Sequence, residues 1–266
     1  MNKKELLFYE AYEAFYEMAG KSEAFHRFCT DAFGEDLSQD GFSDIKQINR
    51  ILPYIPRIEQ THILDVGCGN GKMLGYLQKR TGARIHGFDY SENAIRTAQA
   101  LFPEKSDFRV GLIGETEYPQ VFFDVVISMD TLYFAPDMQK FAAQIKGWPK
   151  PDGVFFAGYQ EGDVMPKTEN MHTTVLAQAL QANDMPYEAI DMTGETYDLL
   201  KKKRRAALRH QKEFTKEGRN LWFDMLMGQT ECAEEPFECF KAKMSRYIYV
   251  ARKQSSRADL QPARKR

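Results

Sequence analysis

The chain has 266 residues, a formal net charge of −2, 43% hydrophobic residues and 28% charged residues. These totals are typical of a soluble globular protein with one large α/β domain, or one domain with a sizeable insertion. They give no reason to expect a nucleic-acid partner, because proteins that bind a polyanion usually carry a basic surface. The four cysteines match neither a zinc-binding pattern nor a disulfide framework, so no metal is expected; they are Cys29, Cys68, Cys232 and Cys239.

The first residues show no apolar segment followed by a small-residue cleavage site, and no stretch has the length of a membrane span. We therefore expect a cytoplasmic protein with reduced thiols and no membrane partner. These totals leave the oligomeric state open.

Residues 1–55 are predicted to form an N-terminal helical cover. Apolar and aromatic residues at helical spacing predict helices over residues 3–19, 22–32 and 43–52. Ser43 is a candidate N-cap for the third of these helices.

Residues 56–160 are predicted to form the core, because short apolar runs alternate with helical patterns there. The run FDVVIS shows no polar alternation, as expected of a strand buried on both faces. Strands are expected at residues 62–66, 83–88, 107–111, 123–128 and 154–159, and helices at 71–79, 91–101 and 138–146. Such alternation predicts a parallel sheet with right-handed crossovers.

The alternation breaks near residue 160. Residues 161–240 are predicted to form a largely helical insertion that includes one core strand near residues 188–192. Residues 241–254 are expected to hold the final core strand, and residues 255–266 a basic, solvated tail.

A glycine-rich loop follows the first core strand. Gly67, Gly69 and Gly71 allow a tight turn and a close approach of the backbone to a ligand. Asp89 ends the next strand, where an acid can accept hydrogen bonds from both hydroxyls of a ribose. Asp65 precedes the loop, and its carboxylate would repel a pyrophosphate but attract a cationic amino group. The G-x-G-x-G spacing and Asp65 together favour S-adenosylmethionine over a dinucleotide.

These stretches resemble the class I S-adenosylmethionine-dependent methyltransferases. The resemblance covers about residues 58–160 and rests on ILDVGCGNGK, GFDYSENAI, FDVVISMDTLYF and PDGVFF, in the order that the family shows. It implies a Rossmann-like, doubly wound, mostly parallel seven-stranded sheet whose last strand is antiparallel. The helical insertion would then lie on the substrate side.

The same resemblance implies the cofactor site. Cys68, together with Asp65, Gly67 and Gly69, would border the methionine part; Asp89 would bind the ribose and Tyr90 would flank the adenosine. The acid that the family often places after the third strand is absent here. Leu112 and Ile113 stand at that point and would sandwich the adenine or use backbone groups.

The segment before the core, Gly34–Phe42, resembles an element of sarcosine- and dimethylglycine-type methyltransferases. By that resemblance Gln39, Gly41 and Phe42 would face the cofactor; an ordinary loop between helices is the alternative. An aromatic stripe in residues 8–16 is typical of a helix packed on a core, and one of its tyrosines, Tyr16 or Tyr12, is expected to reach the cofactor.

The implied activity is methyl transfer from S-adenosylmethionine to a small-molecule substrate by direct in-line displacement. Asp130 and Tyr133, after the fourth strand, are the candidate catalytic residues, and Asp130 as a cap for the following turn is the alternative. Other candidate bases are Tyr159, Glu161 and His172. A methyltransferase for protein or nucleic acid, or a binding protein without catalysis, stays open, as does the acceptor atom.

Overall fold

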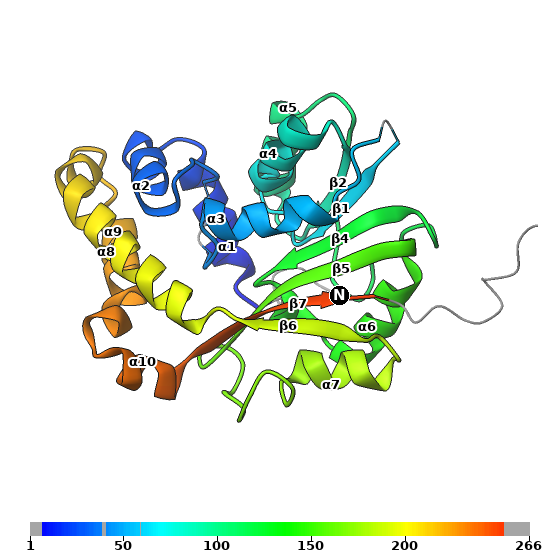
Figure 1. Cartoon of the computed structure of the whole chain (residues 1–266). Coiled ribbons are helices and arrows are strands. Elements are labelled where there is room, and N and C mark those ends of the chain that lie inside the picture. The colour runs from blue at the N-terminus through cyan, green and yellow to red at the C-terminus, as the bar shows by residue number, and fades with distance from the viewer. Residues whose placement is uncertain (1–6, 39–40, 59, 253–266) are drawn as a thin grey trace, which may run out of the picture.

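The structure is a computed structural model that describes residues 7–38, 41–58 and 60–252. Seven strands form one sheet in the order β3-β2-β1-β4-β5-β7-β6 (Figure 1). They are β1 (His62–Val66), β2 (Arg84–Asp89), β3 (Ser106–Val110), β4 (Phe123–Met129), β5 (Pro149–Glu161), β6 (Tyr187–Asp191) and β7 (Ser245–Ala251). The pairs among β1 to β5 are parallel, whereas β7 is antiparallel to both β5 and β6. The predicted doubly wound, mostly parallel sheet with an antiparallel last strand is confirmed.

Helices cover both faces of the sheet. The core helices are α4 (Lys72–Thr81), α5 (Glu92–Leu101), α6 (Met138–Gly147) and α7 (Val175–Ala182). Figure 1 shows α4 and α5 together on one side of the sheet, and α6 and α7 on the other. Because both faces are covered, β4 is buried along almost its whole length, as its continuous apolar run predicts.

The N-terminal part contains α1 (Tyr9–Ala19) and α2 (Glu23–Phe33), followed by the short α3 (Ile45–Ile48) and a 3-10 turn, η2 (Asn49–Tyr54). The predicted cap of the third helix is wrong. Asp44, not Ser43, accepts hydrogen bonds from the N–H groups of Lys46 and Gln47, at 3.1 Å each. Ser43 instead accepts a hydrogen bond from a buried arginine.

The late segment forms three helices, and the longest of them packs against α2. They are α8 (Thr193–Lys216), α9 (Asn220–Gln229) and α10 (Phe237–Lys243), and the 3-10 turn η4 (Glu231–Glu234) joins α9 to α10. Another 3-10 turn, η3 (Leu132–Phe134), follows β4. Phe25 and Phe28 of α2 pack with Ala207 and Phe214 of α8 in one buried cluster. The helices above the site therefore begin at Thr193, whereas α7 packs on α6 and β6 pairs with β7 within the core. The proposed domain division and the basic tail stay predictions, and the tail lies outside the described residues.

Candidate active site

The glycine loop joins β1 to α4. Gly67, Gly69 and Gly71 have φ angles of 74°, 53° and 73°, in the left-handed region where a side chain is strained. A Cβ on Gly67 would lie 2.8 Å from Thr131, and one on Gly69 would collide with the Tyr16 hydroxyl. The sequence therefore needs glycine here both for conformation and for space, because Tyr16 packs directly against the loop.

Asp89 is fixed beside this loop at the end of β2. Its Oδ2 accepts a hydrogen bond from the Gly69 N–H, and its Oδ1 accepts one from the Ser91 N–H, each at 2.9 Å. Burial raises the pKa of Asp89 to about 6, although these hydrogen bonds oppose the rise. The orientation of this carboxyl group as an acceptor is therefore already fixed, and the group ionises near pH 6.

Asp65 is buried on β1, directly before the loop. It is 2% exposed, and its Oδ1 has no hydrogen-bond partner among the described residues. Burial, with a smaller contribution from the charge of Asp89, raises its pKa well above the usual range. A buried carboxyl without a partner is unfavourable unless something else binds there.

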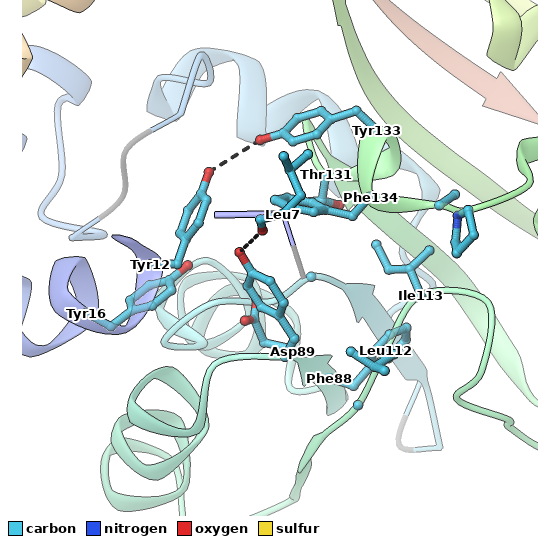
Figure 2. Close-up of a pocket in the computed structure, with 15 residues that line it drawn as sticks. Leu7, Tyr12, Tyr16, Phe88, Asp89, Leu112, Ile113, Thr131, Tyr133 and Phe134 are labelled. Carbon is cyan, nitrogen blue, oxygen red and sulfur yellow. Dashed lines mark hydrogen bonds between the residues drawn. The ribbon is translucent and has the colours of Figure 1, made fainter. Parts of the chain in front are cut away.

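The first of three adjoining cavities has a volume of about 210 Å³ and lies beside Asp89. Figure 2 shows Phe88, Leu112 and Ile113 along one side and Tyr12 and Tyr16 along the opposite side. The cavity is lined by Leu7, Tyr12, Tyr16, Gly67, Phe88, Asp89, Tyr90, Gly111, Leu112, Ile113, Thr131, Tyr133, Phe134, Ala135 and Pro136. Its mostly apolar walls with one acid at the end suit a planar ring attached to a sugar.

The backbone of Leu112 is occupied within its own turn. Its N–H donates to Thr116 Oγ1 at 2.8 Å, and its carbonyl accepts from the N–H groups of Glu115 and Thr116. Leu112 therefore contributes apolar surface to the cavity. Its backbone groups do not replace the acid that the family often has at this point.

The second cavity, of about 120 Å³, lies over the glycine loop. Asp65, Cys68 and Gly69 line it, together with Asp130 and Phe42. Burial raises the pKa of the Cys68 thiol, so this cysteine is a neutral wall residue. Predicted residue Gln39 lies outside the described residues.

Tyr12 and Tyr133 line all three cavities. Their hydroxyl oxygens are 3.3 Å apart and form a hydrogen bond with each other (Figure 2). Burial is the main cause that raises the pKa of Tyr133, so its phenol stays protonated at neutral pH. The two rings separate the first two cavities from a third one, of about 330 Å³, between β5 and α8.

The carboxylate of Asp130 is fully engaged. Its Oδ1 and Oδ2 accept hydrogen bonds from Nε and Nη2 of Arg246, at 2.8 and 2.9 Å. Arg246 lies on β7, is 0% exposed and also donates to Gln47 and to Ser43. Asp130 thus lines the second cavity, but both of its carboxylate oxygens are bound by a guanidinium.

Sequence reasoning missed Arg246. The signal was present, because an arginine inside the otherwise apolar run SRYIYVA is unusual for a buried strand. The other candidate bases lie outside the three cavities. His172 bonds to Tyr187, Tyr159 faces the core, and Glu161 is bound by Thr168.

The helix α1 is tied to the core above the first cavity. Glu13 accepts hydrogen bonds from the Ser91 hydroxyl and from the Asn93 N–H, and the Asn93 amide donates to the Glu13 carbonyl at 3.2 Å. Tyr90 donates to the Leu7 carbonyl at 3.2 Å. These contacts hold the tyrosines of α1 over the site.

Within the described residues, no group of three or more His, Cys, Asp or Glu side chains has the arrangement of a metal site. In the same part of the chain, no helix is long and apolar enough to cross a membrane.

Residues 64–157 match the family model of a methyltransferase domain. The protein named arginine-hydroxylase NDUFAF5, mitochondrial, of Rattus norvegicus is 31% identical over 105 residues, which is 38% of this chain and 29% of that protein. A ubiquinone biosynthesis O-methyltransferase of Methylobacterium nodulans is 34% identical over 103 residues, 38% of this chain and 41% of that protein. The chain thus spans less than half the length of these curated relatives.

Solved structures share the fold. The phosphoethanolamine N-methyltransferase 2 of Haemonchus contortus, in complex with phosphomonomethylethanolamine and S-adenosylhomocysteine, has a TM-score of 0.74 at 17% identity over 92% of this chain and 60% of that one. A candidate sarcosine dimethylglycine methyltransferase of Galdieria sulphuraria has a TM-score of 0.65 at 14% identity, over 79% of this chain and 84% of that one. Residues 64–157 form a methyltransferase domain, and the fold is that of the class I S-adenosylmethionine-dependent methyltransferases.

Proposed function

We propose that the chain is an S-adenosylmethionine-dependent methyltransferase that acts on a small-molecule acceptor. The observation that carries the cofactor is the buried Asp65 carboxyl, whose Oδ1 has no partner among the described residues. The ammonium of the cofactor's methionine part would supply that partner. An oxygen acceptor at this depth fits a cationic amino acid and does not fit a pyrophosphate.

The other predicted residues have consistent places around such a cofactor. Asp89 would accept from the ribose hydroxyls, because Gly69 and Ser91 already orient its carboxylate. Leu112 and Ile113 would hold the adenine by apolar contact. Gly67 and Gly69 let the backbone approach the methionine part.

When bound, the cofactor supplies a methyl group that is already electrophilic. The side chains need only align the acceptor with the S–CH3 bond and exclude water. Tyr12 and Tyr133 stand between the cofactor cavities and the third cavity, so they would form the wall through which the acceptor approaches. The neutral Tyr133 phenol and the Arg246-bound Asp130 are poor general bases, which favours an acceptor atom that needs little base assistance.

A small acceptor is favoured by the size of the third cavity. Its volume of about 330 Å³ suits a metabolite-sized molecule. Residues of α1, β5, α8 and α9 line this cavity, so its walls come partly from segments outside residues 64–157, which match the methyltransferase-domain model. A cytoplasmic location and a partner that is neither nucleic acid nor membrane remain parts of this proposal.

A second candidate function is cofactor binding without methyl transfer. It is favoured by three curated relatives that match 38% of this chain and are named a hydroxylase, not a methyltransferase. Transfer of tritium from methyl-labelled S-adenosylmethionine to a panel of metabolites separates the two. We expect at least one labelled product, and Asp89→Ala is expected to abolish its formation. Tight cofactor binding with no labelled product from any acceptor would support the second candidate.

Cofactor binding is expected to weaken as the pH falls through about 6, the pKa of Asp89. Protonation replaces a carboxylate acceptor with a neutral carboxyl, so the affinity should drop by up to about ten-fold per pH unit below that value. Calorimetric titration with S-adenosylhomocysteine between pH 5 and pH 8 measures this. The loss of affinity below about pH 6 should persist in Asp65→Asn and disappear in Asp89→Asn. If the loss persists in Asp89→Asn, another group is responsible for it.

A further inference from the structure

Four polar side chains bind the glycine loop to the segment that precedes the core. Lys72 Nζ donates to Asp36 Oδ2 at 2.9 Å and to Ser38 Oγ at 2.6 Å. Asp36 Oδ1 accepts from the N–H and the hydroxyl of Ser38, at 2.9 and 2.8 Å. The Asn70 amide donates to the Ser38 carbonyl at 3.3 Å. We call Asp36, Ser38, Asn70 and Lys72 the clasp, because they join residues 36–38 to residues 70–72.

The helix that Lys72 begins does not explain this lysine. Lys72 is the first residue of α4, where the positive end of the helix dipole disfavours a cation. The first turn of α4 contains no acidic residue that would compensate. A residue that violates a local preference usually has a tertiary or functional role. The partners of Lys72 in the clasp supply such a role.

Ser38 is a second departure from local preference. Its φ of 44° lies in the left-handed region, which residues other than glycine rarely adopt. The residue is only 1% exposed, and its N–H, carbonyl and hydroxyl are all bonded within the clasp. A conformation of this kind persists where its surroundings fix it. The clasp therefore determines how the chain runs through residue 38.

One side of the clasp borders the cofactor side of the molecule. Ser38 and Asn70 line the second cavity, together with Leu37 and the glycine loop. Asp36 and Lys72 are not among the residues that line any of the three cavities. A substitution of Lys72 thus removes no wall of the second cavity and can affect a molecule there only through Ser38 and Asn70.

We propose that Lys72 is a positioning residue that slows the release of the cofactor. It holds residues 36–38 against the glycine loop, so that Leu37 and Ser38 stay in the wall around the methionine part. This inference rests on the proposed function, since it concerns the same cofactor site. The side chains of Lys72 and Asp36 are 20% and 27% exposed, so dissolved salt should weaken their ion pair.

The test is surface plasmon resonance of the immobilised full chain with S-adenosylhomocysteine, which gives the association and dissociation rate constants. Lys72→Met should raise the dissociation rate constant by about three- to ten-fold, as the loss of a partly exposed charge-assisted contact predicts. Lys72→Arg keeps the charge and should recover most of the slow release. Asp36→Asn should also accelerate release, and the double variant Asp36→Asn with Lys72→Met should add little to either single change.

The salt dependence provides a readout that a purely structural role would not change. Between about 50 mM and about 500 mM sodium chloride, the dissociation rate constant of the wild-type chain should rise more than that of Lys72→Met. The matched control is Lys79→Met, because Lys79 is an exposed lysine of the same helix. This control should release S-adenosylhomocysteine at the wild-type rate and with the wild-type salt dependence.

The clasp is refuted if Lys72→Met and Asp36→Asn both release the ligand at the wild-type rate, or if their effects multiply in the double variant. Thermal unfolding shows whether each variant is folded, and if Lys72→Met does not fold, Asp36→Asn and its salt dependence decide. No binding of S-adenosylhomocysteine to the wild-type chain would overturn the proposed function, and the clasp with it. Binding by the wild type without any change in the variants overturns the clasp alone.

Discussion

Asp65→Asn is expected to raise the thermal stability of the ligand-free protein at pH 8 and to weaken S-adenosylhomocysteine binding by about 10- to 100-fold. The binding loss corresponds to one charge-assisted contact with the ligand's ammonium. The stability gain follows because the substitution removes a buried carboxyl whose Oδ1 has no partner among the described residues. Stability and affinity therefore move in opposite directions.

The stability gain of Asp65→Asn should depend on pH. The pKa of Asp65 is raised above its unfolded value by burial, so the folded state binds the proton more tightly than the unfolded chain. The contribution of Asp65 to stability is complete below the unfolded pKa and is lost as the pH rises through the folded one. The advantage of Asn should thus be present at pH 8 and vanish below about pH 4.

Thermal unfolding and calorimetry measure the two quantities. The matched control is Asp124→Asn, another buried acid, at the opposite end of a neighbouring strand. Asp124 accepts hydrogen bonds from the His62 N–H and from Lys150 Nζ, at 2.8 Å each, so its neutralisation should lower stability and leave cofactor affinity unchanged. An Asp65→Asn protein that melts earlier at pH 8, or binds as tightly as wild type, would remove the basis for assigning Asp65 to the ammonium.

The sheet and the glycine loop could be predicted from sequence because their signals are local. The loop, the acid before it and the acid after the next strand all fall within residues 65–89. Parallel strands bring their carboxyl ends to one edge, so chain order alone places Asp65 beside Asp89. Helix ends were predicted to within a few residues where a single residue dominates, as Ser91 does for α5.

The acceptor side could not be predicted in the same way. The pairing of Asp130 with Arg246 joins positions 116 residues apart, and no local pattern around either residue encodes it. Ser43 and Asp44 are both residue types that cap helices well; Asp44 caps α3, and the Ser43 hydroxyl accepts a hydrogen bond from the distant Arg246. The three cavities likewise depend on how α1 packs over the sheet, and the third also depends on α8, which long-range contacts decide.

Arg246→Met is expected to lower the free energy of unfolding by about 3–5 kcal/mol, because removing one partner leaves a buried carboxylate unpaired. Arg246 is 0% exposed, and Asp130, Gln47 and Ser43 all lose their bond to it. Urea unfolding followed by tryptophan fluorescence measures the loss. Arg246→Met combined with Asp130→Asn should lose less than the sum of the two single variants, since the unpaired charge is removed. Additive losses would show that the pair does not stabilise the site as a unit.

The same variants decide what Asp130 does. Its φ of 57° lies in the left-handed region, which asparagine tolerates, so Asp130→Asn keeps the backbone while it weakens the bond to Arg246. If Asp130 positions the loop after β4, this variant should lower stability and kcat/KM together and leave the shape of the pH–rate profile intact. A general base would instead show its own acidic limb, and that limb would vanish in Asp130→Asn. The bidentate contact with Arg246 favours the first outcome, because a carboxylate that already accepts two hydrogen bonds from a guanidinium is a weak acceptor for a substrate proton.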